Sequence, residues 1–137
     1  MSQVYWNLIL ENYRIAYQTQ GDEFHMSVGI VVALLMEERD LSMLNPINEN
    51  NVLTMYIGDF YDEGRTPTIT LELKSESGKP SVFNNHIKFT FRDNFKDGKF
   101  YRQIKETVFC SWSEALEVFD EFFEKLKAAT PSIISIG

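Results

Sequence analysis

Apolar and polar residues alternate along two segments in the middle of the chain, and this alternation limits the possible fold more than any other feature. In residues 68–74 and 87–92 every second residue is apolar: Ile69, Leu71, Leu73, Ile87, Phe89 and Phe91. Successive side chains of a β-strand point to opposite faces of the sheet. Each segment therefore predicts a strand with one buried face and one polar face.

Two further strands are expected at Val52 to Ile57 and at Phe100 to Phe109. Asp97-Gly98 precedes the last of them, and this dipeptide favours a two-residue hairpin turn because both central residues of that turn need positive φ. Short polar segments that contain glycine separate the other strands. The pattern indicates a four-stranded antiparallel meander.

The segment from Ser111 to Leu126 shows the spacing of an amphipathic helix. Its apolar residues recur every three or four positions, at Trp112, Ala115, Leu116, Phe119, Phe122, Phe123 and Leu126. Ser111 and Glu114 match a capping box, in which two side chains satisfy two backbone donors at the start of the helix. This helix is expected to pack on the sheet.

The N-terminal part of the chain predicts one or two helices. From Val4 to Tyr17 the larger apolar residues follow helical spacing. Ser27 to Leu44 fits a second helix, but the β-branched run Val28 to Val32 also fits a buried strand. Asn45-Pro46 ends the segment in both interpretations. The whole chain, 1–137, is thus expected to be a single α+β domain.

No motif for catalysis, cofactor binding or metal binding is present. His25 and His86 lie far apart in the sequence, and the only cysteine, Cys110, falls in an apolar run where burial makes a thiol inert. The chain has no nucleotide-binding glycine motif and no serine-hydrolase motif. We therefore expect a protein that is not an enzyme and that uses no cofactor or metal.

Charge is sorted along the chain. Residues 1–73 hold 3 Lys/Arg against 11 Asp/Glu, residues 74–110 hold 8 against 4, and residues 111–137 hold 2 against 5. The net charge is −7. A basic middle between acidic flanks predicts a surface with separate positive and negative areas, which would steer a charged partner.

The basic middle does not indicate nucleic-acid binding. Phe89 and Phe91 alternate with Lys88 and Arg92, so rings and charges are expected on opposite faces of the strand. A sheet that stacks bases needs both on its open face.

The acidic segments favour binding of another protein with a basic surface. Asp59, Phe60, Tyr61, Asp62 and Glu63 combine carboxylates with aromatic rings in an expected loop, and aromatic residues often anchor interfaces. We expect these five residues to bind the partner. The leading hypothesis is a stoichiometric acidic inhibitor, of the immunity or anti-defence type, that occludes a basic site on its partner; the sequence defines no oligomeric state.

The alternative function is that of a small-molecule-binding domain, with a pocket between the N-terminal helices and the sheet. Trp6, Tyr13 and Tyr17 are the aromatic residues that would line this pocket. The longest apolar run, Val28 to Met36, is too short to cross a bilayer. The start of the chain shows no secretory signal, so no membrane contact and a cytoplasmic location are expected.

Overall fold

The computed structural model describes residues 2–20, 23–49, 52–58, 61, 66–73, 87–97 and 100–130. The elements follow the order α1 (Ser2–Gln20), α2 (Glu23–Glu38), β1 (Leu44–Glu49), β2 (Val52–Ile57), β3 (Thr68–Leu73), β4 (Ile87–Asp97), β5 (Phe100–Cys110), the 3-10 turn η1 (Trp112–Glu114) and α3 (Ala115–Ala129). The expected α+β class, the antiparallel meander and the C-terminal helix on the sheet are confirmed.

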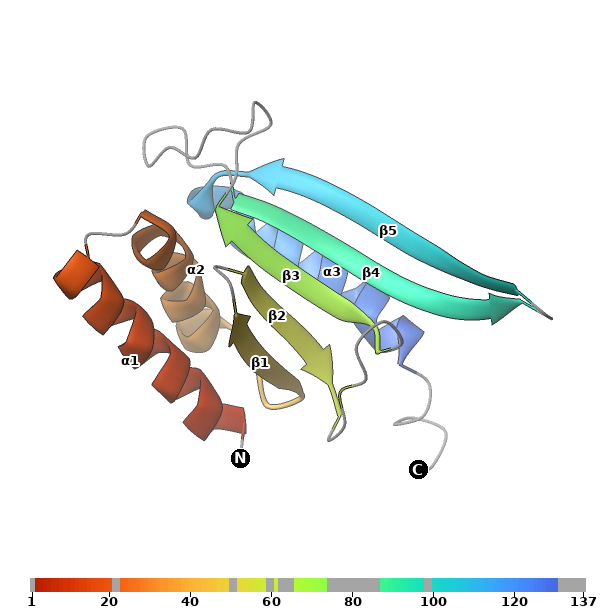
Figure 1. The fold of residues 1–137 in the computed structure, drawn as a ribbon, viewed down its shortest axis with the longest axis horizontal. Coiled ribbons are helices and arrows are strands. Elements are labelled where there is room, and N and C mark those ends of the chain that lie inside the picture. The colour runs from red at the N-terminus through yellow and green to blue at the C-terminus, as the bar shows by residue number, and fades with distance from the viewer. Residues whose placement is uncertain are drawn as a thin grey trace.

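The sheet has five strands in the order of the chain, β1 to β5, and each pairs antiparallel with its neighbours (Figure 1). The sheet thus has one strand more than the four predicted: β1 contains Asn45-Pro46, where the sequence predicts only the end of the preceding segment. Pro46, which lacks an N–H group, lies opposite Met55 in this strand. Proline is tolerated there because β1 is at the edge of the sheet and pairs on one side only.

Residues 28–32 belong to helix α2, so the alternative of a buried strand was wrong. The helix buries Val28, Val31, Val32 and Leu35 completely. Its glycine, Gly29, allows close packing on α1: a Cβ placed there would lie 3.6 Å from Cβ of Tyr13. Packing of this apolar surface outweighs the strand preference of the β-branched residues.

Helices α2 and α3 cover one face of the sheet, with α3 behind β3 and β4, while α1 packs on α2 and beside the edge strand β1 (Figure 1). This covered face carries the core residues of the central strands, all of them buried: Leu53, Met55, Ile57, Ile69, Leu71, Ile87, Phe89 and Phe91. Phe89 meets Phe122 of α3 edge to face, with ring centres 6.1 Å apart. The expected burial of one face of each alternating strand is confirmed.

Helix α1 is tied to the edge strand β1 by two aromatic side chains. Trp6 donates from Nε1 to the carbonyl oxygen of Leu44 at 3.1 Å, and the Tyr13 hydroxyl donates to Oδ1 of Asn48 at 3.0 Å. Both rings are buried, with exposed fractions of 0% and 1%. The polar groups of both buried rings thus have hydrogen-bond partners on β1.

The start of α3 forms only part of the expected capping box. The backbone N–H of Ser111 donates to Oε1 of Glu114 at 3.2 Å, as predicted. The Ser111 hydroxyl donates to the same carboxylate oxygen at 2.9 Å, while the Glu114 N–H bonds to the carbonyl oxygen of Ser111. The 3-10 turn η1 brings the carboxylate to the hydroxyl and so replaces the second reciprocal bond.

Candidate functional site

The partner-binding residues expected from the sequence are only partly described. Asp59, Phe60, Asp62 and Glu63 lie outside the described residues. Tyr61 is half-buried, and its ring packs on Tyr56 with the centres 5.1 Å apart and the planes tilted by 39°. The structure thus shows one residue of this set, held by an aromatic contact to strand β2.

A row of exposed carboxylates follows the solvent side of η1 and α3. We call it the acidic stripe; its members are Glu114, Glu117, Asp120, Glu121 and Glu124. It lies opposite the buried side of the helix, which is formed by Ala115, Phe119, Phe122 and Leu126. The positions three and four residues apart are neighbours on a helix, so these like charges repel one another.

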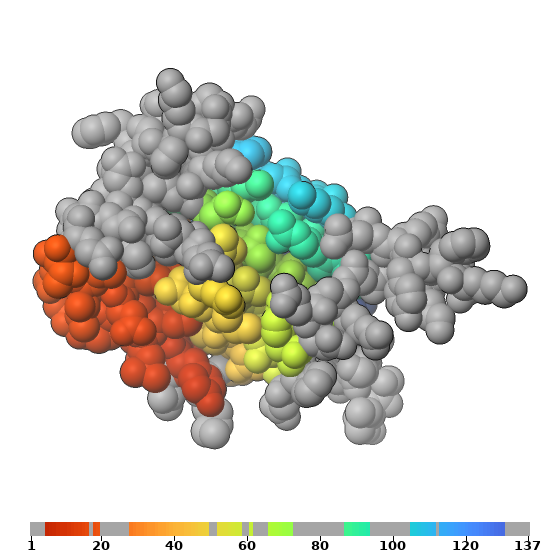
Figure 2. Space-filling model, viewed as in Figure 1, coloured from red at the N-terminus to blue at the C-terminus, as the bar shows by residue number. Residues whose placement is uncertain are grey.

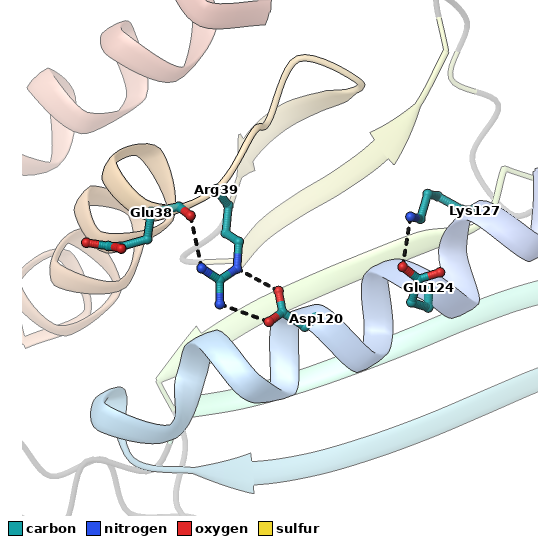
Figure 3. Close-up of polar contacts among 5 residues, drawn as sticks. All are labelled: Glu38, Arg39, Asp120, Glu124 and Lys127. Atoms are coloured by element: carbon teal, nitrogen blue, oxygen red, sulfur yellow. Dashed lines mark hydrogen bonds and ion pairs between the residues drawn. The ribbon is translucent and has the colours of Figure 1, made fainter.

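Two carboxylates of the acidic stripe are paired with cations (Figure 3). Arg39, just after α2, donates from Nε and Nη2 to the two carboxylate oxygens of Asp120, and Lys127 bonds to Glu124 at 2.8 Å. The other three, Glu114, Glu117 and Glu121, have no ion-pair partner among the side chains that the structure describes. Hydrogen bonds from Ser111 lower the pKa of Glu114, which keeps its carboxylate charged.

The opposite face of the sheet is covered by no helix of the described chain. We call it the open face, and Figure 2 views the molecule from this side. The middle of this face is a row of four threonines, one on each of the strands β2 to β5. The paired positions are Thr54, Thr70, Thr90 and Thr107.

The two central threonines are buried although they belong to the open face. Thr70 is 5% exposed and accepts a hydrogen bond from Nη1 of Arg92 at 3.2 Å. Thr90 is 0% exposed, and its hydroxyl has no hydrogen-bond partner in the described part of the chain. A buried hydroxyl left unpaired costs about 1–3 kcal/mol, so this group needs an explanation.

The charged side chains of the open face are mostly basic. Lys88 and Arg92 flank Thr90 on β4, and Lys105 lies opposite Arg92 on β5. Two acidic residues share the face: Glu72, opposite Lys88, and Glu49 on β1. Lys88 also lies over the ring of Phe109, with its Nζ 6.0 Å from the ring centre. The basic middle of the sequence thus supplies the open face, while its Phe89 and Phe91 rings point into the core.

Cys110 does not have the environment of a reactive thiol. The residue is 5% exposed, and burial, followed by the negative charge of Glu114, raises the pKa of its thiol from 9.0 to about 12. Burial also raises the pKa of the Tyr13 hydroxyl. Among the described residues no three His, Cys, Asp or Glu side chains come together as metal ligands would.

The alternative of a small-molecule pocket beside the N-terminal helices stays a prediction. Two of its expected lining residues, Trp6 and Tyr13, are buried in the core and hydrogen-bonded to β1. The third, Tyr17, lies in α1. In the part of the chain that is described, no helix combines the length and the apolar composition needed to span a membrane.

Sequence reasoning missed the threonine row and the contact between Arg92 and Thr70. The sequence does contain an indication of threonines on this face, because Thr68, Thr70 and Thr90 occupy the polar positions of the alternating strands. Only the register between strands, however, brings the threonines into one row. The chain matches no protein-family model, no curated protein and no solved structure.

Proposed function

We propose that the protein is a non-catalytic module that binds another protein, as a stoichiometric inhibitor of the immunity or anti-defence type. It acts by occluding a basic site on its partner. The observation that carries this proposal is the acidic stripe, where five exposed carboxylates lie along one helix and three of them lack an ion pair among the described side chains. Such a surface attracts a basic partner and speeds its association.

The arrangement of the acidic stripe supports a role in binding more than a role in folding. Glu117 and Glu121 are four residues apart on an exposed helix face, and like charges at this spacing destabilise a helix. A basic surface placed against them would relieve this repulsion. Arg39 and Lys127 relieve it for Asp120 and Glu124 within the protein itself.

The loop expected at residues 59–63 supplies the second part of the proposed interface. Asp59, Asp62 and Glu63 would add carboxylates, and Phe60 or Tyr61 would anchor the contact. The Tyr61 ring is already packed on Tyr56. An aromatic side chain that is ordered before binding loses less conformational entropy in the complex.

The test is to identify a partner and to compare two groups of charge variants. The parent protein is used as bait in a lysate of its native host, and a candidate is then purified and mixed with it at known concentrations. The proposal requires a 1:1 complex in light scattering and loss of the partner's own activity on saturation.

One variant combines Glu117→Gln and Glu121→Gln, and the second combines Asp59→Ala, Asp62→Ala and Glu63→Ala. Glu11→Gln on α1 is the matched control, because Glu11 is exposed and already paired with Arg14. Weaker binding of either variant with an unchanged control assigns the interface to the stripe, to the loop or to both. A complex that neither variant weakens would exclude an acidic interface.

A further inference from the structure

We propose that the free edge of β5 binds a second copy of this protein, so that two five-stranded sheets join into one in a symmetric dimer. β5 is the last strand of the sheet and pairs with β4; on its other side no strand of the described chain lies (Figure 1). The proposal does not depend on the inhibitor function. The acidic stripe belongs to η1 and α3 and stays outside the joined edge, so each chain of the dimer can still hold one partner.

The β5 edge lacks three features that natural sheets use against pairing at an edge. These features are a short strand, a proline and a β-bulge. β5 is 11 residues long and contains no proline. Each of its residues pairs in turn with one residue of β4, so the ladder has no bulge. The outward N–H and C=O groups of β5 therefore form a regular template for a further strand.

The opposite edge of the sheet, at β1, is protected. β1 has 6 residues, and Pro46 within it lacks an N–H group. Helix α1 lies beside this strand, and its Trp6 and Tyr13 side chains bond to it (Figure 1). The sheet can therefore be extended at β5 but not at β1. Pairing of two β5 strands about a two-fold axis uses up both open edges, so a closed dimer is expected and not a fibre.

The geometry of a β-ladder limits how two β5 strands can pair with each other. Along a strand only every second residue turns its N–H and C=O groups toward a given neighbour. Both copies present the same set of residues, so the numbers of two directly opposed residues add up to an even number. One residue then faces its own copy at the two-fold axis. This axis is perpendicular to the joined sheet, and the helices of both copies lie on the same side of it.

The charges of β5 favour one position of the axis. With the axis at position 102, 105 or 106 a charged residue would face its own like charge, and with the axis at Gln103 no charges are paired. With the axis at Ile104, Arg102 of each copy lies opposite Glu106 of the other. Opposite charges directly across a ladder stabilise it, and like charges destabilise it. The edge is thus complementary in charge to a second copy of itself.

The remaining opposed positions in this register are also favourable. Two of them combine an aromatic residue with a β-branched residue, two β-branched residues meet at the axis, and the lysine faces an amide. The pairs are Phe100 with Val108, Tyr101 with Thr107, Ile104 with Ile104, and Gln103 with Lys105.

The two charged residues that the structure describes on this edge are accessible to a second copy. Lys105 and Glu106 are both exposed, as is Thr107 beside them. Glu106 bonds to Lys125 of α3 in the single chain. A carboxylate has two acceptor oxygens and can bind a second cation at the same time, so this ion pair does not block the contact with Arg102 of the second copy.

The first measurement is the mass of the full-length protein by sedimentation equilibrium over a range of concentrations. A reversible change from one chain of 16.0 kDa to twice that mass is expected. A single chain at all concentrations, or assemblies that grow beyond two chains, would overturn the proposal. So would a protein that stays single while the strand of another protein protects the β5 amides from hydrogen exchange.

Charge reversal tests the register. Arg102→Glu and Glu106→Arg each set like charges opposite each other in both ion pairs, so each variant alone should stay a single chain where the parent is a dimer. An equal mixture of the two variants should form a dimer, because positions 102 and 106 then carry opposite charges in both pairs. Glu49→Arg on β1 is the control, since it reverses an exposed charge at the opposite edge and should leave the dimer intact. Dimers of both single variants, or no dimer in the mixture, would contradict the proposal.

A disulfide at the axis tests the same register without changing any charge pair. Ile104→Cys, in a chain that also carries Cys110→Ala, places a thiol directly opposite its own copy. The Cα atoms of directly opposed residues are about 4.5–5.5 Å apart, which suits a disulfide. Lys105→Cys is the control, because position 105 lies opposite Gln103. Mild oxidation should link the Ile104→Cys protein into a covalent dimer faster than the Lys105→Cys protein, and the reverse order would overturn the proposal.

Discussion

Arg39 and Asp120 join the end of α2 to the middle of α3 through two parallel hydrogen bonds. Nε of Arg39 lies 2.8 Å from Oδ1 of Asp120, and Nη2 lies 2.9 Å from Oδ2 (Figure 3). The two residues are 81 positions apart in the sequence. This fork-to-fork geometry needs the planar guanidinium and cannot be copied by lysine. The contact therefore links the end of α2 to the helix that carries the acidic stripe.

The Arg39 and Asp120 pair should contribute a small, salt-sensitive coupling to stability. Both side chains are partly exposed, at 34% and 48%, so water and ions screen their interaction. The measurement is a double-mutant cycle of Arg39→Gln and Asp120→Asn by urea unfolding. A favourable coupling is expected at low salt and none in about 1 M NaCl, where the screening length falls to about 3 Å. An equal coupling at both salt concentrations would show that the contact is not mainly electrostatic.

Trp6→Phe should destabilise the protein by about 1–3 kcal/mol, because it removes the indole N–H that donates to the carbonyl of Leu44, a buried residue. The effect is read from the urea midpoint with an unchanged slope. Tyr5→Phe is the matched control on the same helix, since Tyr5 is 50% exposed and should change the midpoint little. A Trp6→Phe protein as stable as the parent would show that this hydrogen bond does not stabilise the contact of α1 with β1.

Gly29→Ala should stabilise the protein by about 0.5–1 kcal/mol, the gain expected for alanine over glycine inside a helix. The added Cβ would lie 3.6 and 3.7 Å from two Tyr13 carbons, which is ordinary van der Waals contact. Gly29→Leu should have the opposite effect, because the larger side chain must push α1 away from α2. The opposite order of stability for the two variants in urea would contradict this packing.

The thiol of Cys110 should react with alkylating reagents only after unfolding. Its pKa is raised by burial to about 12, and the thiolate is the reactive form. Native protein at pH 8 should therefore modify far more slowly than protein in urea. Fast modification of the native protein would show that Cys110 is accessible.

The same raised pKa also predicts a loss of stability in alkaline solution. Between pH 9.0 and about 12 the unfolded chain loses the thiol proton while the native protein keeps it. The native state then binds more protons than the unfolded state, so the free energy of unfolding falls as the pH rises. The buried hydroxyl of Tyr13, whose pKa is also raised, acts in the same direction. A parallel pH series with Cys110→Ala should show a smaller decrease.

The elements with strong periodicity could be predicted from the sequence. The alternating segments became β3 and the first half of β4, and the C-terminal apolar stripe became α3. Two elements could not be assigned. The local sequence from Val28 to Val32 is compatible with both a helix and a strand. Only the packing of α1 on Gly29 and of the core on Leu35 favours the helix. β1 contains Pro46 and little alternation, and its pairing with β2 defines it as a strand.

The candidate sites depend on contacts between residues that lie far apart in the sequence. The sequence pattern does not show which of these residues meet. The charge pattern predicted separate acidic and basic areas; in the structure, exposed carboxylates line η1 and α3, while the described open face carries Lys88, Arg92 and Lys105 together with Glu72 and Glu49. It did not reveal the bond from Arg92 to Thr70, which crosses between strands and joins residues 22 positions apart. Nor did it reveal that Thr90 is buried without a partner among the described residues. Both features depend on the register between the strands. The hydrophobic pattern defines that register only when all strands of the sheet are paired.

The central claim is that the acidic surface holds a basic protein partner, and titration calorimetry of the purified pair tests it most directly. The variant that combines Glu117→Gln and Glu121→Gln keeps the shape of both side chains and removes their charges. We predict that it binds at least about tenfold more weakly than the parent, a difference of about 1.4 kcal/mol, and that the affinity falls less steeply with salt. Equal affinity and equal salt dependence for this variant and the parent would contradict the claim for the acidic stripe.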